Sequence, residues 1–287
     1  MLREQISRFQ RLYSLEKLKS RAVSSDPSYA GEYKYLLDLV EKLKLTSGPV
    51  LDIAASDGYN QSSTLGFYRN GWTGLAVEMD PEKFATLSYL YNDFPGVNLA
   101  KTRVTPNNII SLLQAFEIPR DIAILNLDID SYDLSVAKSL LAGGYRPQII
   151  SMEINEKIPV GIYFSVIFTE EHFWQGDHFY GCSVDAAVRT IKPYGYSLVS
   201  VQFNNAFFVK DSIANGYFRD LSSEDAWESG YKNHPDRKSL FPWNSDVEDW
   251  LECNPEEAVQ FIQRFFLKYE GLYVLALTSS LSVGDQL

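Results

Sequence analysis

The residues best suited to chemistry are acids that follow two apolar runs. The motif DIAILNLDIDSYD ends in Asp128, Asp130 and Asp133, and the motif QIISMEIN carries Glu153 and Asn155. If both runs are strands of one open α/β sheet, their carboxyl ends bring these side chains to the edge where such sheets bind ligands. Crowded carboxylates raise the pKa of at least one member or require a cation.

These acids allow three interpretations. In the first, Asp128 or Asp130 is a general base that takes the proton of an acceptor hydroxyl. In the second, Asp128, Asp130 and Glu153 supply oxygen ligands to Mg²⁺, which orients the acceptor and lowers its pKa. In the third, Asp130 or Asp133 caps the following helix and Asp128 alone faces the ligand.

Two of the three histidines lie in the segment between Glu153 and Cys182. His172 and His178 are each candidates for a catalytic base near neutral pH, or for a metal contact; alternatively each is a packed or solvent-facing side chain. The segment is aromatic and lacks clear periodicity, which indicates an ordered loop that forms a wall over the site.

The elements that must position these residues are predicted by short apolar runs alternating with helical segments. Strands are expected at 50–54, 73–78, 97–101, 122–128 and 148–153, and helices at 61–69, 81–92, 106–116, 134–141 and 183–192. A hairpin is expected from 197–202 and 206–210, with a turn at Asn204 and Asn205. The predicted fold class is α/β, a doubly wound, Rossmann-like sheet with five parallel strands and a terminal antiparallel hairpin. That ending is typical of methyltransferase sheets.

The turn after the first strand is a candidate cofactor loop. It runs from Ala54 through Ser56 to Gly58, and its small residues would let a ligand approach a helix N-terminus. A dinucleotide pyrophosphate needs glycine at close-approach positions, which here hold Ala54, Ser56 and Tyr59. S-adenosylmethionine carries no phosphate and tolerates side chains at these positions.

Three acids complete the predicted cofactor site. Glu78 ends the second strand, where it could accept hydrogen bonds from both ribose hydroxyls. Asp52 or Asp57 could orient the loop or accept from the methionine amino group. In the alternative interpretation Asp52 and Asp57 cap a turn, and Glu78 caps the next helix.

The termini lie outside the alternating pattern, which predicts an N-terminal helical segment at 1–47, a cofactor-binding domain at 48–211 and a C-terminal helical extension at 212–287. Amphipathic helices are expected at 2–20, 29–45 and 256–269. The apolar stripe of the first could cover the protein's own core, form a lid or make a homodimer contact through the terminal helices.

Charge and composition narrow the partners. The net charge is -11, with 26 Lys and Arg against 37 Asp and Glu, which disfavours nucleic acid as a partner. The sequence shows neither an apolar run long enough for a membrane span nor a signal peptide, so no membrane partner and a cytoplasmic location are expected. The two cysteines are not in a paired spacing, and we expect reduced thiols.

Several motifs in order along residues 49–210 resemble the FkbM-type class I methyltransferases. They are DIAASDG, NGWTGLAVEMDPEKF, VTPNNI, DIAILNLDIDSYD, RPQIISMEIN, YGCS and NNAFFVK. The chain departs from the family pattern where Ala54 replaces the first glycine and where Ser131 follows the IDID-like run. Residues outside 49–210 have no counterpart in the resemblance.

The resemblance implies methylation dependent on S-adenosylmethionine, usually of an oxygen on a small-molecule or carbohydrate-like acceptor. The family's cofactor loop falls on Ala54 to Gly58, its ribose acid on Glu78, and its acidic strand end on Asp128 and Asp130. Asp128 is therefore expected to contact the cofactor. The acidic pair is also similar to metal-dependent sugar O-methyltransferases of the macrocin type and to the cephalosporin hydroxylase group, which implies Mg²⁺.

Two other functions fit the same sheet. One is an NAD-type oxidoreductase, and the other is a catalytically silent binding or scaffold protein that uses its terminal helices for a partner. Binding of NADH or of S-adenosylhomocysteine would separate the first from a methyltransferase, and binding of neither would favour the second.

Overall fold

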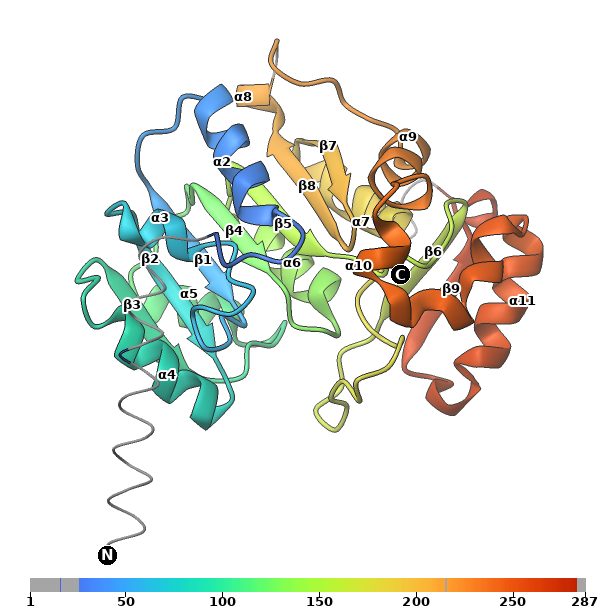
Figure 1. The fold of residues 1–287 in the computed structure, drawn as a ribbon, viewed down its shortest axis with the longest axis horizontal. Coiled ribbons are helices and arrows are strands. Elements are labelled where there is room, and N and C mark those ends of the chain that lie inside the picture. Colours follow the sequence, from blue (N-terminus) through green and yellow to red (C-terminus); the bar gives the residue numbers. More distant parts are fainter. Residues whose placement is uncertain (1–15, 17–25, 215, 283–287) are drawn as a thin grey trace, which may run out of the picture. The chain divides into compact units, whose positions relative to one another are not determined.

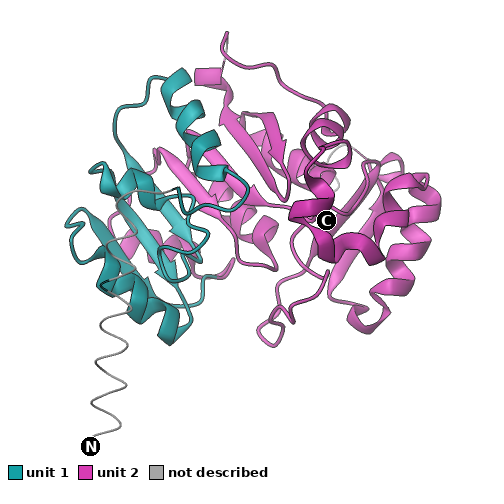
Figure 2. Cartoon of the chain, viewed as in Figure 1, with its two compact units in different colours: residues 1–104 teal, residues 105–287 magenta. Residues whose placement is uncertain are grey.

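The computed structural model describes residues 16, 26–214 and 216–282, which fall into two compact units, 1–104 and 105–287 (Figure 2). The expected division at 47/48 and 211/212 stays a prediction. The amphipathic helix expected at 2–20 lies outside the described residues, apart from Glu16. No helix among the described residues is long and apolar enough to cross a membrane.

Unit 1 contains three parallel strands in the order β3-β2-β1 (Figure 1). Its elements are α2 (Glu32–Lys42), β1 (Pro49–Ile53), α3 (Leu65–Arg69), β2 (Thr73–Glu78), α4 (Pro81–Tyr91) and β3 (Val97–Lys101). The N-terminus of α4 is capped by Asp80, whose carboxylate accepts from the amides of Glu82 and Lys83 at 2.8 and 2.9 Å. The helix expected at 61–69 begins only at Leu65, after the N-cap residue Thr64, and Ser62 Oγ accepts from Leu65 N at 3.1 Å.

Unit 2 contains two parallel strands, β4 and β5, followed in the sheet by the antiparallel pair β8 and β7. The elements are α5 (Ile109–Ala115), β4 (Ile124–Leu127), α6 (Asp133–Ala142), β5 (Ile149–Glu153), α7 (Val184–Ile191), η1 (Lys192–Tyr194), β7 (Tyr196–Gln202) and β8 (Asn205–Lys210). Every residue of β5 is buried, as expected for an inner strand. With the strands of unit 1, these elements confirm the predicted α/β class and its terminal hairpin.

A second, two-stranded sheet was not predicted. It pairs β6 (Ile162–Val166) antiparallel with β9 (Tyr273–Leu277) (Figure 1). The prediction that the segment after Glu153 is a loop without regular structure was therefore wrong over β6. The C-terminal extension, predicted as helical, also supplies a strand.

The remaining elements of the extension are short helices and one longer one. They are α8 (Asp211–Ala214), α9 (Ser223–Trp227), the π-helix η2 (Glu228–Lys232), α10 (Arg237–Leu240), η3 (Pro242–Asp246), η4 (Glu248–Glu252), α11 (Pro255–Phe265), η5 (Leu267–Tyr269) and η6 (Thr278–Ser280). Ile262 and Phe266 from α11 and the residue after it pack on Phe164 of β6 in one buried apolar cluster. Because apolar burial is the main favourable term in folding, this cluster fixes the second sheet to the extension.

Candidate functional site

The turn after β1 in unit 1 adopts an unusual backbone. Ala54 and Ser56 have positive φ angles of 66° and 53°, which non-glycine residues rarely adopt. The turn is held to β2 because Ala55 N donates to Val77 O at 2.9 Å, and it closes on itself through Gly58 N and Ala55 O at 3.0 Å. Strained backbone of this kind is often found where a fold binds a ligand.

Glu78, the last residue of β2, connects this turn to the next helix. Its Oε2 accepts from Ser56 N at 2.9 Å, and its Oε1 accepts from Asp80 N at 2.6 Å. The side chain is 5% exposed. A carboxylate has about four lone-pair positions, so two further donors can bind the same group. The expected ribose acid is thus fixed against the expected cofactor loop.

The other acids of the predicted cofactor site hold local structure. Buried Asp52 accepts from Thr64 Oγ1 at 2.6 Å, next to the start of α3. Asp57 Oδ1 accepts from Tyr59 N and Asn60 N at 3.0 and 2.8 Å. The contacts of Asp57 are the turn-capping arrangement that the sequence left open as an alternative, whereas Asp52 is bonded from within β1 to a side chain twelve residues later and does not cap a turn.

Gly58 is required by packing. Its φ angle is +78°, and a Cβ there would lie 2.6 Å from Leu87 Cδ1 and 2.8 Å from Tyr91 Cε1. The glycine therefore lets the turn pack closely on α4, and a role in cofactor binding remains a prediction for this residue.

In unit 2 the structure brings together the three predicted metal ligands. Asp128 directly follows β4, Asp130 has a φ angle of 60°, and Glu153 ends β5. One carboxylate oxygen from each of the three lies within 4.8 Å of the others. Parallel neighbouring strands place their carboxyl ends side by side, which is why acids far apart in the sequence meet here.

Glu153 is the most deeply buried member of this acidic cluster, with an exposed fraction of 3%. Its Oε1 accepts from Asn204 Nδ2 at 3.2 Å, whereas its buried Oε2 has no hydrogen-bond partner among the described residues. Burial raises the pKa of Glu153 well above its usual range, and the negative charges of Asp128 and Asp130 raise it further. A buried oxygen without a donor, beside two more carboxylates, fits a hard divalent cation.

Asp133 supports the loop that carries the cluster. Its carboxylate accepts from Ile129 N at 2.7 Å and from Ser131 N at 3.1 Å. The residue is fully buried, and desolvation raises its pKa to about 7, against the opposing effect of these two hydrogen bonds. Asp133 thus acts on the conformation of the turn after β4.

The two candidate histidines lie among residues of the C-terminal extension. His178 Nε2 is 3.0 Å from Asp246 Oδ1, and burial together with the charge of Lys157 lowers the pKa of His178. His172 packs edge-on against Phe179 and Tyr269, at ring-centre distances of 5.3 and 5.6 Å. Neither is part of the cluster of Asp128, Asp130 and Glu153. Their catalytic roles stay predictions.

A buried ion pair follows Glu153 and was missed in the sequence. Lys157 Nζ donates to Glu156 Oε1 at 3.1 Å and to Tyr180 OH at 2.5 Å, and Tyr180 OH donates to Glu156 Oε2 at 2.8 Å. Exposed fractions are 1% for Lys157, 0% for Glu156 and 7% for Tyr180. The available signal was the motif MEINEKIPVGIY, in which three charges lie within an apolar run and must find partners if that run is buried.

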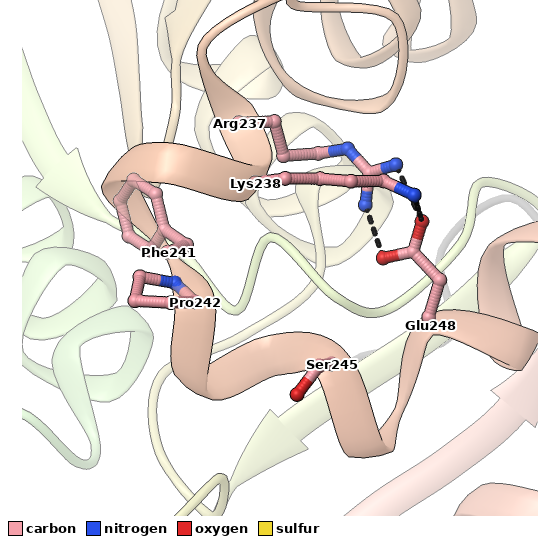
Figure 3. Close-up of a pocket in the computed structure, with 6 residues that line it drawn as sticks. All are labelled: Arg237, Lys238, Phe241, Pro242, Ser245 and Glu248. Carbon is pink, nitrogen blue, oxygen red and sulfur yellow. Dashed lines mark hydrogen bonds and ion pairs between the residues drawn. The ribbon is translucent and has the colours of Figure 1, made fainter.

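The extension also contains a cavity of about 240 Å³ (Figure 3). Arg237 binds Glu248 through two hydrogen bonds of 2.7 Å, and Lys238 lies 3.1 Å from the same carboxylate. Phe241 and Pro242 form the opposite, apolar wall. The charged side chains that line this cavity pair with one another, so ion pairing accounts for their arrangement.

Several solved methyltransferase structures are similar to this chain. A TehB-like SAM-dependent methyltransferase from Corynebacterium glutamicum has a TM-score of 0.37 and 15% identity, covering 73% of this chain and 100% of that one. A S-adenosylmethionine-dependent methyltransferase from Clostridium acetobutylicum has a TM-score of 0.41 and 12% identity, covering 71% and 98%. Magnesium protoporphyrin IX methyltransferase from Synechocystis, with bound SAH, has a TM-score of 0.39 and 9% identity, covering 72% and 99%.

These neighbours are methyltransferases, but their low TM-scores and identities do not assign a function or a substrate to this chain. No family model matches the sequence, and no curated protein matches it significantly. Membership of the FkbM group accordingly stays a prediction.

Proposed function

We propose that this protein is an S-adenosylmethionine-dependent methyltransferase that methylates a hydroxyl oxygen of a small-molecule or carbohydrate-like acceptor. The observation that carries the proposal is the position of Glu78, buried at the end of β2 and hydrogen-bonded to Ser56 N in the turn after β1. Its carboxylate would accept from the ribose hydroxyls of the cofactor. Ala54 and Ser56 occupy positions at which a pyrophosphate would need glycine, which supports a cofactor without phosphate.

The acidic cluster of unit 2 is assigned to the acceptor and, with Mg²⁺, to its activation. Asp128, Asp130 and Glu153 would hold the ion, and the orphaned Oε2 of Glu153 supports this assignment. Bound there, Mg²⁺ would lower the pKa of the acceptor hydroxyl. In methyl transfer the acceptor oxygen bonds to the methyl carbon, and the carbon–sulfur bond breaks with its electron pair on sulfur. The hydroxyl proton would pass to solvent when Mg²⁺ is bound, and to Asp128 or Asp130 acting as base in the metal-free alternative.

Binding experiments test the cofactor assignment. Isothermal titration of the full chain with S-adenosylhomocysteine should show one site, whereas NADH should not bind. Absence of S-adenosylhomocysteine binding would reject the cofactor assignment and favour the scaffold alternative. Binding of NADH in its place would favour the oxidoreductase.

Metal dependence needs its own measurement. Activity on an identified acceptor should fall in excess chelator and return on addition of Mg²⁺. Activity that is unaffected by the chelator would leave Asp128 or Asp130 as a metal-free base and would remove Mg²⁺ from the mechanism.

A further inference from the structure

The buried pair of Lys157 and Glu156 is not accounted for by stability alone. Desolvating two charges cancels much of their attraction, and well-packed apolar residues often stabilise a fold as well or better. Here the Lys157 ammonium also lies 4.1 Å from the centre of the Tyr180 ring. The arrangement fixes Tyr180 by its ring and by its hydroxyl group. The position of Tyr180 affects the acidic cluster through the backbone around it.

The segment from Tyr180 to Cys182 joins the two strand ends that carry the acidic cluster. Gly181 N donates to Ser131 O at 2.7 Å, one residue beyond Asp130. Tyr180 O accepts from Asn155 Nδ2 at 2.9 Å, and Cys182 O accepts from Asn155 N at 2.7 Å, two residues beyond the end of β5. A displacement of Tyr180 would thus be transmitted to both sides of the cluster.

The C-terminal extension holds the ion pair from the other side. Asn244 Nδ2, in η3, donates to Glu156 Oε1 at 2.7 Å and to Tyr231 OH at 2.9 Å. Trp227 Nε1, in α9, donates to the main-chain oxygen of Glu156 at 2.7 Å. These donors are all buried, and such a network resists displacement because every broken bond would leave a polar group without water.

We propose that Lys157 is a positioning residue for the acidic cluster, acting through Glu156 and Tyr180, and that the C-terminal extension is needed to keep it in place. The inference rests on the proposed role of Asp128, Asp130 and Glu153 as cation ligands. Three oxygens within 4.8 Å of one another can share one ion only while both strand ends keep their separation. Lys157 and its partners maintain that separation.

The test is Mn²⁺ binding to the full chain, measured by calorimetry on the wild type, Lys157→Met and Lys157→Arg. Residues that orient metal ligands typically contribute 10–100-fold to metal affinity, so Lys157→Met should bind Mn²⁺ at least about tenfold more weakly. Lys157→Arg keeps a charge and several donors and should recover part of the loss. S-adenosylhomocysteine affinity, measured on the same samples, should change less than about twofold, since Glu78 and its loop are unaltered.

Lys268→Met is the matched control. Lys268 Nζ binds Asp177 Oδ2 at 2.9 Å and lies 4.6 Å from the ring centre of Tyr269, so a lysine, a carboxylate and a tyrosine also meet here, with the lysine exposed. Its Mn²⁺ affinity should equal that of the wild type. Unchanged Mn²⁺ binding in Lys157→Met, or an equal loss in Lys268→Met, would overturn the inference.

A second variant guards against misfolding. Tyr180→Phe keeps the ring and the ion pair but removes the shared hydroxyl, and it should also weaken Mn²⁺ binding. It therefore tests the proposal even if Lys157→Met does not fold. Full Mn²⁺ affinity in a folded Tyr180→Phe protein would count against the proposal. If the wild type binds S-adenosylhomocysteine but no Mn²⁺, the metal site and this inference both fall while the cofactor assignment stands.

Discussion

Replacement of Glu78 by glutamine tests the cofactor site most directly. The carboxylate accepts two backbone N–H groups, from Ser56 at 2.9 Å and Asp80 at 2.6 Å. Glutamine keeps one acceptor oxygen and turns the other into a donor, which would face an amide hydrogen. Hydrogen bonds to charged groups contribute about 1.5–3 kcal/mol each. Losing one and weakening the other should lower the free energy of unfolding by about 2–4 kcal/mol.

The same substitution removes from the protein one acceptor for the ribose hydroxyls of the cofactor. Loss of one charge-assisted bond, about 1.5–3 kcal/mol, corresponds to roughly 10–100-fold weaker binding of S-adenosylhomocysteine. Calorimetric titration measures the affinity, and urea unfolding of the same protein measures its stability. The titration should be carried out under conditions in which the variant is fully folded, so that a loss of folded protein is not mistaken for a loss of binding.

Glu82→Gln is the control for Glu78→Gln. It makes the same change of charge four residues along the chain, at an exposed position in the first turn of α4. The control should leave affinity unchanged and alter stability by less than about 0.5 kcal/mol. If Glu78→Gln retains wild-type affinity while remaining folded, Glu78 does not bind the ribose and the proposed cofactor site is wrong.

Three further predictions concern unit 2. Because burial lowers the pKa of His178, the unfolded chain binds a proton at this residue more readily than the folded chain does. The stability that His178 contributes should therefore be complete above pH about 6.5 and decline at lower pH. In urea unfolding, His178→Asn should reduce that decline. Gly181→Ala should destabilise more than Gly176→Ala: both have positive φ angles, +62° and +73°, but a Cβ at Gly181 would lie 3.3 Å from a backbone nitrogen and one at Gly176 meets nothing within 4 Å. Equal losses in thermal unfolding would show that backbone conformation alone matters. Arg237→Met should lower the free energy of unfolding by about 1 kcal/mol near neutral pH, because the hydrogen bonds from Arg237 lower the pKa of Glu248. The difference from wild type should vanish as acid protonates Glu248. A difference that is independent of pH would exclude the ion pair as its cause.

Much of the site follows from local pattern. Asp128, Asp130 and Glu153 each end an apolar run, and parallel pairing of β4 with β5 is sufficient to bring them together. The position of Glu78 is likewise fixed by the length of β2. Periodicity and strand ends therefore predicted the acids, although not which of their oxygens would lack a donor.

The second sheet could not be read in the same way. β6 is a run of five residues, IYFSV, too short for its apolar pattern to distinguish a strand from a buried loop. Its partner β9 lies more than a hundred residues later, and nothing local to either strand specifies the pairing. Burial of Lys157 was missed for a related reason: it depends on a contact with Tyr180, which lies 23 residues later in the chain.

The pairing of β6 with β9 also sets an order of events during folding. In the register of this pair, Ile162 lies opposite Leu277. A strand that pairs so far along the chain must wait for its partner to emerge from the ribosome and then close a long loop, which is slow. Until then the apolar face of β6 lacks its cover and offers an unpaired edge, so this protein should be most prone to aggregation in the interval after β6 and the main sheet are made and before β9 is available.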